Sequence, residues 1–137
     1  MRVAVVLLSL LISGCATTPP PAWRVKTAKQ DQYLAMQSCA HCATVQIARD
    51  EGHIGALNSV YISIDETELA FVNVSEVATL KIEAGKREVC LQPGPKSLTF
   101  PECKEMIFEE GSSSKIRVSF DAAGALHFRR VKQDAPN

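Results

Sequence analysis

Two cysteines three positions apart are the residues of this chain whose type and spacing most directly suggest chemistry. The run Cys39-Ala40-His41-Cys42 is a C-x-x-C pair with a histidine between the cysteines. Such a pair can carry redox chemistry when it opens a helix in a βαβ unit. Two thiolates and an imidazole can also bind zinc or copper. A fourth ligand would come from one of three sulfur-bearing side chains: Met36, Cys90 or Cys103.

The surroundings of this motif favour a simpler interpretation. The motif precedes an alternating, strand-like stretch, and no βαβ pattern surrounds it. It also differs from a haem-attachment motif, because Ala43 rather than a histidine follows Cys42. We therefore expect the cysteines to be disulfide partners. A redox or metal site formed by Cys39, His41 and Cys42 is the alternative.

Cys90 and Cys103 form the second candidate pair. Each lies in a predicted strand, on either side of a proline-rich loop. Antiparallel pairing of consecutive strands would bring the two cysteines together, at a separation that a disulfide can bridge. We favour Cys90 with Cys103 and leave Cys39 with Cys42 as a local pair or as separate thiols. Four cysteines allow three connectivities, and the two that link these pairs to each other stay open.

The remaining polar residues form no catalytic constellation. His53 lies in a glycine-containing loop, and His127 takes the solvent-facing position of an alternating strand. No Ser, His and Asp are spaced in a way that suggests a triad. The chain has 15 basic and 15 acidic residues, so it has no strong electrostatic reason to bind nucleic acid. We expect no enzyme activity and no small-molecule substrate.

Charged side chains gather in the last third of the chain. The acidic ones are Glu102, Glu105, Glu109 and Glu110, and the basic ones are Arg117, Arg129, Arg130 and Lys132. We expect them to pair across strands on solvated faces. The alternative is a docking surface for a protein partner.

The amino terminus carries a different signal. Arg2 precedes an apolar stretch, 3–12, that is too short to span a bilayer but suits the core of a signal peptide. The stretch Leu11-Ile12-Ser13-Gly14-Cys15 resembles the lipobox of bacterial lipoproteins. The resemblance implies cleavage before Cys15 and covalent attachment of lipid to Cys15. We expect no cofactor besides this lipid. Because Ala16 rather than Asp follows, it also implies the inner leaflet of the outer membrane, facing the periplasm.

These signals divide the chain into four parts: a signal peptide 1–14, a lipidated and proline-rich tether 15–38, a β domain 39–131 and a polar tail 132–137. Three consecutive prolines, 19–21, predict an extended spacer. Residues 16–29 would reach at most about 45 Å when fully extended. Trp23 would either rest at the lipid headgroups or pack on the edge of the domain.

From residue 43 onward, apolar side chains recur at every second position. Turn residues divide this region into about seven short strands, which is typical of a sandwich or barrel. We predict an all-β fold of two antiparallel sheets packed face to face. The alternation also predicts the buried core: Val45, Ile47, Val60, Ile62, Ile64, Leu80, Ile82, Val89, Leu91, Phe108, Ile116, Val118, Phe120, Leu126 and Phe128.

Two stretches resemble PEGA-like β domains of short bacterial lipoproteins. In 60–65, VYISID, a strand ends in Ile-Asp, and in 79–91, TLKIEAGKREVCL, a strand ends in Ala-Gly before its hairpin partner. Glu66 departs from the pattern, which usually has Gly there. The resemblance implies a small extracytoplasmic β-sandwich of undefined function and no catalytic residues.

Taken together, the sequence predicts a non-enzymatic envelope protein held to the membrane by lipid. Its β-sandwich would be a structural or protein-binding module. The alternative is a small redox or metal-handling lipoprotein that uses Cys39, His41 and Cys42.

Overall fold

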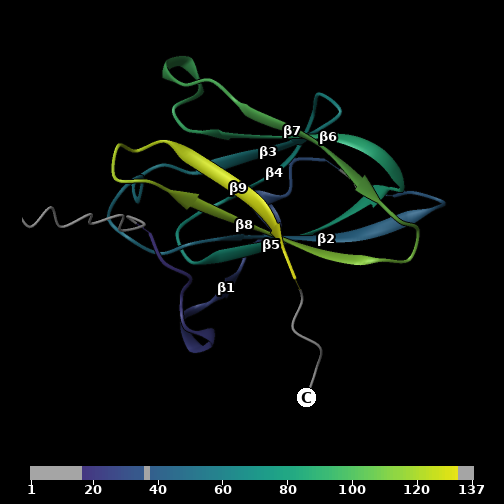
Figure 1. The fold of residues 1–137 in the computed structure, drawn as a ribbon, viewed down its shortest axis with the longest axis horizontal. Coiled ribbons are helices and arrows are strands. Elements are labelled where there is room, and N and C mark those ends of the chain that lie inside the picture. The colour runs from purple at the N-terminus through teal and green to yellow at the C-terminus, as the bar shows by residue number, and fades with distance from the viewer. Residues whose placement is uncertain (1–16, 36–37, 133–137) are drawn as a thin grey trace, which may run out of the picture.

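The computed structural model describes residues 17–35 and 38–132. They form two β-sheets packed face to face (Figure 1), and this part of the chain contains no α-helix, only short 3-10 turns. The predicted all-β sandwich is therefore confirmed, with nine strands in the two sheets.

The larger sheet has five strands in the order β1-β5-β2-β8-β9. Their bounds are β1 Lys26–Thr27, β2 Cys42–Arg49, β5 Glu76–Glu83, β8 Ser113–Phe120 and β9 Leu126–Val131. Two neighbouring pairs, β1 with β5 and β2 with β8, run parallel. The sheets are otherwise antiparallel, as predicted. These two pairs differ because both link segments distant in sequence, whose direction no local turn dictates.

The smaller sheet has four antiparallel strands in the order β4-β3-β6-β7. Their bounds are β3 Val60–Ile64, β4 Thr67–Val72, β6 Gly85–Pro93 and β7 Glu102–Phe108. Asp65 and Glu66 alone join β3 to β4, and both have positive φ, 47° and 68°. This is the geometry of a tight two-residue hairpin, which normally favours Asn-Gly or Asp-Gly. The chain thus makes the turn expected after Asp65 even with Glu66 in place of Gly.

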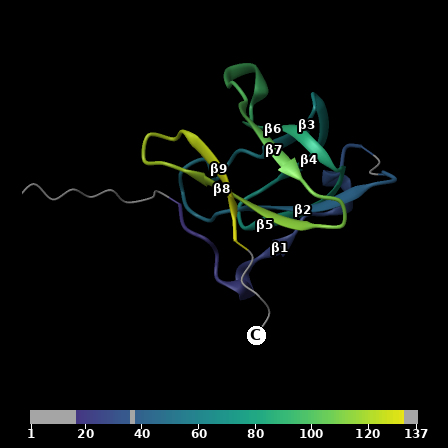
Figure 2. The same cartoon turned by 45° about the vertical axis from the view of Figure 1, so that its right-hand side comes forward.

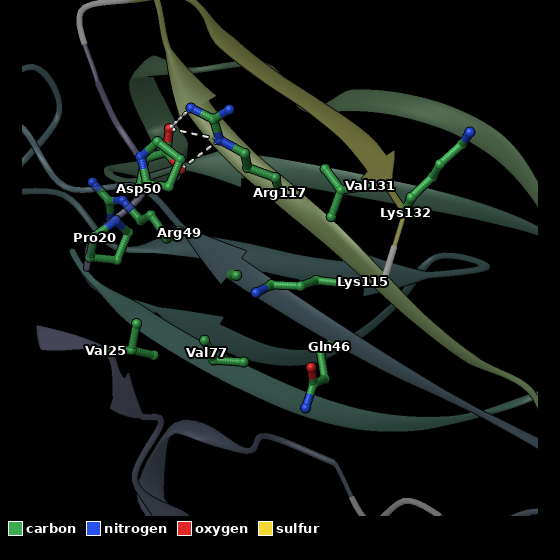
Figure 3. Close-up of a pocket in the computed structure, with 12 residues that line it drawn as sticks. Pro20, Val25, Gln46, Arg49, Asp50, Val77, Lys115, Arg117, Val131 and Lys132 are labelled. Atoms are coloured by element: carbon green, nitrogen blue, oxygen red, sulfur yellow. Dashed lines mark hydrogen bonds and ion pairs between the residues drawn. The ribbon is translucent and has the colours of Figure 1, made fainter. Parts of the chain in front are cut away.

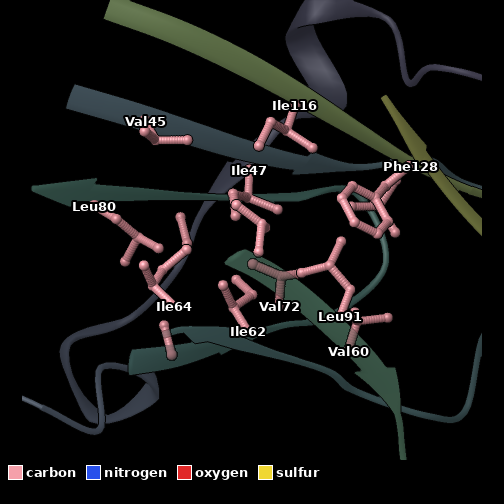
Figure 4. Packing of buried hydrophobic residues seen from close by; sticks show 14 of the residues in the cluster. Val45, Ile47, Val60, Ile62, Ile64, Val72, Leu80, Leu91, Ile116 and Phe128 are labelled. Carbon is pink, nitrogen blue, oxygen red and sulfur yellow. The ribbon is translucent and has the colours of Figure 1, made fainter. Parts of the chain in front are cut away.

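Alternation along the strands builds the core between the sheets. All the core residues predicted from the period of two are buried, as in β2, where Val45 and Ile47 are fully covered. Side chains from both sheets point toward one another in Figure 4. The structure adds small or flanking residues to this core: Ala28, Ala43, Ala70, Val72 and Ala78.

The segment expected to be a tether packs against the sandwich wherever it is described. Thr17 is 2% exposed, Ala28 is 6% exposed and Gln32 is 3% exposed. Thr18 bridges to Glu51, and β1 adds a short strand to the edge of β5. The folded unit therefore includes residues before 39, among them Thr17, Ala28 and Gln32. The proline-rich composition carries no signal of the polar contacts made by the residues around it, so the sequence did not predict these contacts.

The strand directions give the sandwich two distinct ends. We call one the entry end: it holds Thr17 and the loops 50–59, 73–75, 94–101 and 121–125. It lies on the left of Figure 1, where the described chain begins in purple. The opposite, distal end holds the turns 38–41, 65–66 and 109–112. Figure 2 shows the yellow β8–β9 loop at the entry end from a second angle.

Candidate functional site

The first predicted site residue, Cys15, lies outside the described residues, so its placement is untested. Within the described ranges, no helix is both long and apolar enough to cross a membrane. The four other cysteines are all placed, and each is joined to another cysteine.

Cys90 and Cys103 form a disulfide directly across the β6–β7 ladder. Their Cα atoms are 4.1 Å apart. Inward-facing Val89 and Leu91 flank Cys90, so alternation directs the disulfide to the outer face of the smaller sheet. This is the connectivity favoured from the sequence, and it ties the two strands together beside the loop 94–101.

Cys39 and Cys42 form the second disulfide, at the distal end, where Cys42 is the first residue of β2. His41 does not face these sulfurs as a third ligand. Its Nδ1 lies 2.9 Å from Oε1 of Glu110, and both side chains are largely exposed. With both sulfurs bonded to each other, this form of the protein offers no thiolate to a metal. The structure also keeps Cys90 and Cys103 on the other sheet, away from this motif.

One group of possible metal ligands remains on the smaller sheet. The carboxylate of Glu88 and the sulfurs of Cys90 and Cys103 lie within 4.8 Å of one another. Because the two sulfurs share a disulfide, they are poor ligands, and Glu88 alone would hold an ion only weakly. The geometry is that of a cross-strand disulfide with an acidic neighbour.

The largest departure from the sequence prediction is a buried arginine at the entry end. Arg49 is 2% exposed and ends β2 between the sheets. Its guanidinium donates to the carbonyls of Asn58, Gly55 and Val72, and it lies 5.3 Å above the Phe120 ring. Burial lowers the pKa of Arg49 to about 10, while the negative charge of Glu76 opposes that shift. One side chain thereby joins the loop 50–59 to the end of β4.

The signal for Arg49 was in the sequence. Residue 49 has the same parity as Val45 and Ile47, so strict alternation points it inward. A core prediction based on apolar side chains leaves out a charged residue such as Arg49. The sequence also does not show that three backbone carbonyls lie close to its guanidinium.

A second polar cluster fixes the amino-terminal segment. Gln32 donates to Oε2 of Glu76 at 2.6 Å, and the backbone N–H of Asn73 donates to the same oxygen at 2.8 Å. Asp50 receives two N–H groups of Arg117, at 2.6 to 3.0 Å, and lies within 3.4 Å of the Thr17 hydroxyl. No buried side-chain nitrogen or oxygen of the described residues lacks a partner. These groups satisfy one another, and their role is to hold the segment in place.

A groove of about 610 Å³ opens on the outer face of the larger sheet, between the amino-terminal segment and β8 (Figure 3). Its basic side chains include Lys115 and Lys132, and Arg117 is held by Asp50 at its edge. Arg49 and Asp50 also line the groove, and its remaining lining residues are apolar or amide side chains: Pro19, Pro20, Val25, Gln46, Ala48, Val77 and Val131. The lining contains no serine, cysteine or histidine that could act as a nucleophile.

The predicted acidic and basic clusters do not pair with each other. Glu105 bonds Lys86 at 2.8 Å, and Arg117 bonds Asp50. Arg130 of β9 instead donates to the Ile107 carbonyl of β7 at 2.7 Å.

A reciprocal contact closes the seam between β7 and β9, which lie at the edges of different sheets. Lys104 of β7 donates to the Phe128 carbonyl of β9 at 2.6 Å and lies 4.7 Å above its ring. Arg130 of β9 lies 4.6 Å above the ring of Phe108 in β7. Cationic side chains on exposed edges discourage pairing with further strands.

The sequence matches no protein-family model, and neither a curated protein nor a solved structure matches it. The resemblances to a lipobox and to PEGA-like domains rest on the residues quoted for them.

Proposed function

We propose that this chain is a lipid-anchored protein of the bacterial cell envelope, and that its β-sandwich is a non-enzymatic structural or protein-binding module. The observation that carries the proposal is the apolar stretch 3–12 followed by Ser13-Gly14-Cys15. It combines the core of a signal peptide with a cysteine after small residues, and two or three acyl chains there would anchor a protein stably.

Two features of the folded domain support this location. The four cysteines other than Cys15 form two disulfides, which persist in oxidising compartments such as the bacterial periplasm. The second feature is the groove of Figure 3, whose walls are basic and apolar and carry no serine, cysteine or histidine. It suits binding of an acidic or extended segment of an envelope partner rather than catalysis.

Metabolic labelling with a fatty acid tests the anchor. The unaltered protein should take up label and sediment with outer-membrane markers, whereas Cys15→Ala should lose the label. Ser13→Ala is the matched control, because alanine is also small and should preserve labelling. Label retained in Cys15→Ala would refute the anchor. Sedimentation with inner-membrane markers would refute the predicted leaflet alone.

A photo-crosslinker in the groove tests the module. Placed at Gln46, it should capture an envelope protein in intact cells, while the same group at Glu105 on the other sheet should not. Equal capture at both positions, or none at Gln46, would exclude the groove as the binding surface.

The second candidate function is redox or metal chemistry at Cys39 and Cys42. The observation that favours it is the placement of this disulfide in a surface turn, with only two residues between its cysteines. Cys90 and Cys103 instead face each other across a ladder. Thiol counting on the native protein separates the two functions, since two free thiols at residues 39 and 42 would favour the second.

A further inference from the structure

We propose that the entry end of the sandwich lies directly on the lipid surface, with the loop 94–101 touching the bilayer. This inference rests on the proposed anchor at Cys15. It goes further by assigning the membrane-facing surface of the domain.

The first argument is the length of chain between the anchor and the fold. Thr17 is buried and bonded to the backbone of Phe120, so it is a fixed point of the domain. Cys15 is two residues away, a distance of at most about 7 Å between Cα atoms. The headgroup layer on each side of a bilayer is only about 5–8 Å thick. A lipid on Cys15 therefore holds Thr17 at the level of the headgroups or just outside them.

The second argument is the position of exposed apolar side chains. Leu57, Leu98 and Phe100 are 101%, 79% and 91% exposed. All three lie in loops of the entry end, the same end that holds Thr17. Leucine and phenylalanine on such loops gain free energy when they enter the interface between headgroups and acyl chains.

The third argument is charge. Apart from His53, the ionisable residues in the loops of the entry end each have a partner side chain within the fold. These pairs are Asp50 with Arg117, Glu51 with Arg24, Lys96 with Glu68 and Asp121 with His127. Placing this end near lipid therefore leaves these charges paired.

The distal end has the opposite character. Its turns 38–41, 65–66 and 109–112 carry no large aliphatic side chain. Asp65 there pairs with Arg87 and Glu110 with His41, whereas Glu66 and Glu109 are exposed carboxylates. Anionic lipids repel carboxylates. The two ends thus favour the same orientation, with the distal end and its Cys39–Cys42 disulfide facing away from the membrane.

Quenching by brominated lipids tests the orientation. The full-length lipidated protein, with its single tryptophan replaced by Trp23→Phe, is reconstituted in phosphatidylethanolamine–phosphatidylglycerol vesicles with brominated acyl chains. Leu98→Trp and Phe100→Trp, each at an exposed position, should lose several times more fluorescence than Ile107→Trp. Ile107 is the matched control, because it is 66% exposed but lies near the distal end of β7.

Each outcome decides the matter. If Cys15 carries acyl mass and neither Leu98→Trp nor Phe100→Trp is quenched, this orientation is wrong while the anchor stands. Equal quenching of Ile107→Trp would also overturn it. If Cys15 carries no acyl mass, the proposed function fails, and this inference fails with it. If substitutions in the loop 94–101 unfold the protein, quenching of Leu57→Trp tests the same orientation from a different loop of the entry end.

Discussion

The hydroxyl of Thr17 bonds both backbone groups of Phe120, a residue 103 positions later in the chain. Its oxygen accepts the N–H of Phe120 at 2.9 Å and lies 3.3 Å from the Phe120 carbonyl, to which it can donate. Phe120 ends β8, where its backbone would otherwise lack partners. The contact therefore ties the first described residue of the chain to the entry end of the sandwich.

Replacing Thr17 with valine should destabilise the protein. Thr17→Val keeps the shape but leaves the buried N–H of Phe120 unpaired, which should cost about 1–2 kcal/mol of unfolding free energy. Urea unfolding measures this cost. The control is Thr18→Val, since Thr18 is exposed and bridges through its backbone. Equal effects of the two variants would show that the Thr17 hydroxyl holds nothing in place.

Arg49 should tolerate no substitution by lysine, although the charge is preserved. A single ammonium cannot match the planar donors that reach the carbonyls of Gly55, Asn58 and Val72. Arg49→Lys should therefore lower the unfolding free energy by about 2–4 kcal/mol, since buried carbonyls lose their partners. Arg24→Lys, at an exposed ion pair, should change it by less than about 0.5 kcal/mol. A wild-type urea midpoint for Arg49→Lys would contradict this role.

The two disulfides should contribute unequally to stability. Their cysteines are separated by 13 and by 3 positions. In the chain-entropy model, the longer loop stabilises by about 3 kcal/mol and the shorter by about 2 kcal/mol. The double variant Cys90→Ala/Cys103→Ala should thus unfold at lower urea than Cys39→Ala/Cys42→Ala. The reverse order would show that the Cys39–Cys42 disulfide stabilises the fold by more than the loop-closure entropy of its short loop.

Asp65 should contribute to the acid sensitivity of the fold. The backbone N–H of Glu88 donates to its carboxylate, and Arg87 also bonds it, so its pKa lies below the usual 3.8. A lowered folded pKa gives stability that is present above pH 3.8 and is lost as pH falls through the folded pKa. Asp65→Asn should therefore flatten the fall of the urea midpoint below about pH 4. If the urea midpoint of Asp65→Asn falls with pH as steeply as that of the unaltered protein, Asp65 does not contribute to the acid sensitivity.

The period of two in the sequence predicted the core and the two-layer fold, because burial in a strand depends mainly on parity. It could not predict that β2 and β8 run parallel, since that pairing joins residues far apart in sequence. The hydrogen bonds between Thr17 and Phe120 could not be predicted from the sequence either, because a threonine beside a run of prolines is also typical of an unstructured linker. The alternation of side chains along β2 did predict that Arg49 points inward. It could not predict which backbone carbonyls accept hydrogen bonds from Arg49, because these come from other segments of the chain.

The mass of the amino-terminal peptide tests the central claim most directly. Trypsin should release a peptide from Cys15 to Arg24 that carries a diacylglyceryl group on the sulfur, with or without an acyl chain on the new amino group. That result would establish the anchor and its position two residues before the buried Thr17. A peptide that runs from Val3 to Arg24, which trypsin would release from an uncleaved chain, or one that begins at Cys15 without lipid, would contradict the account.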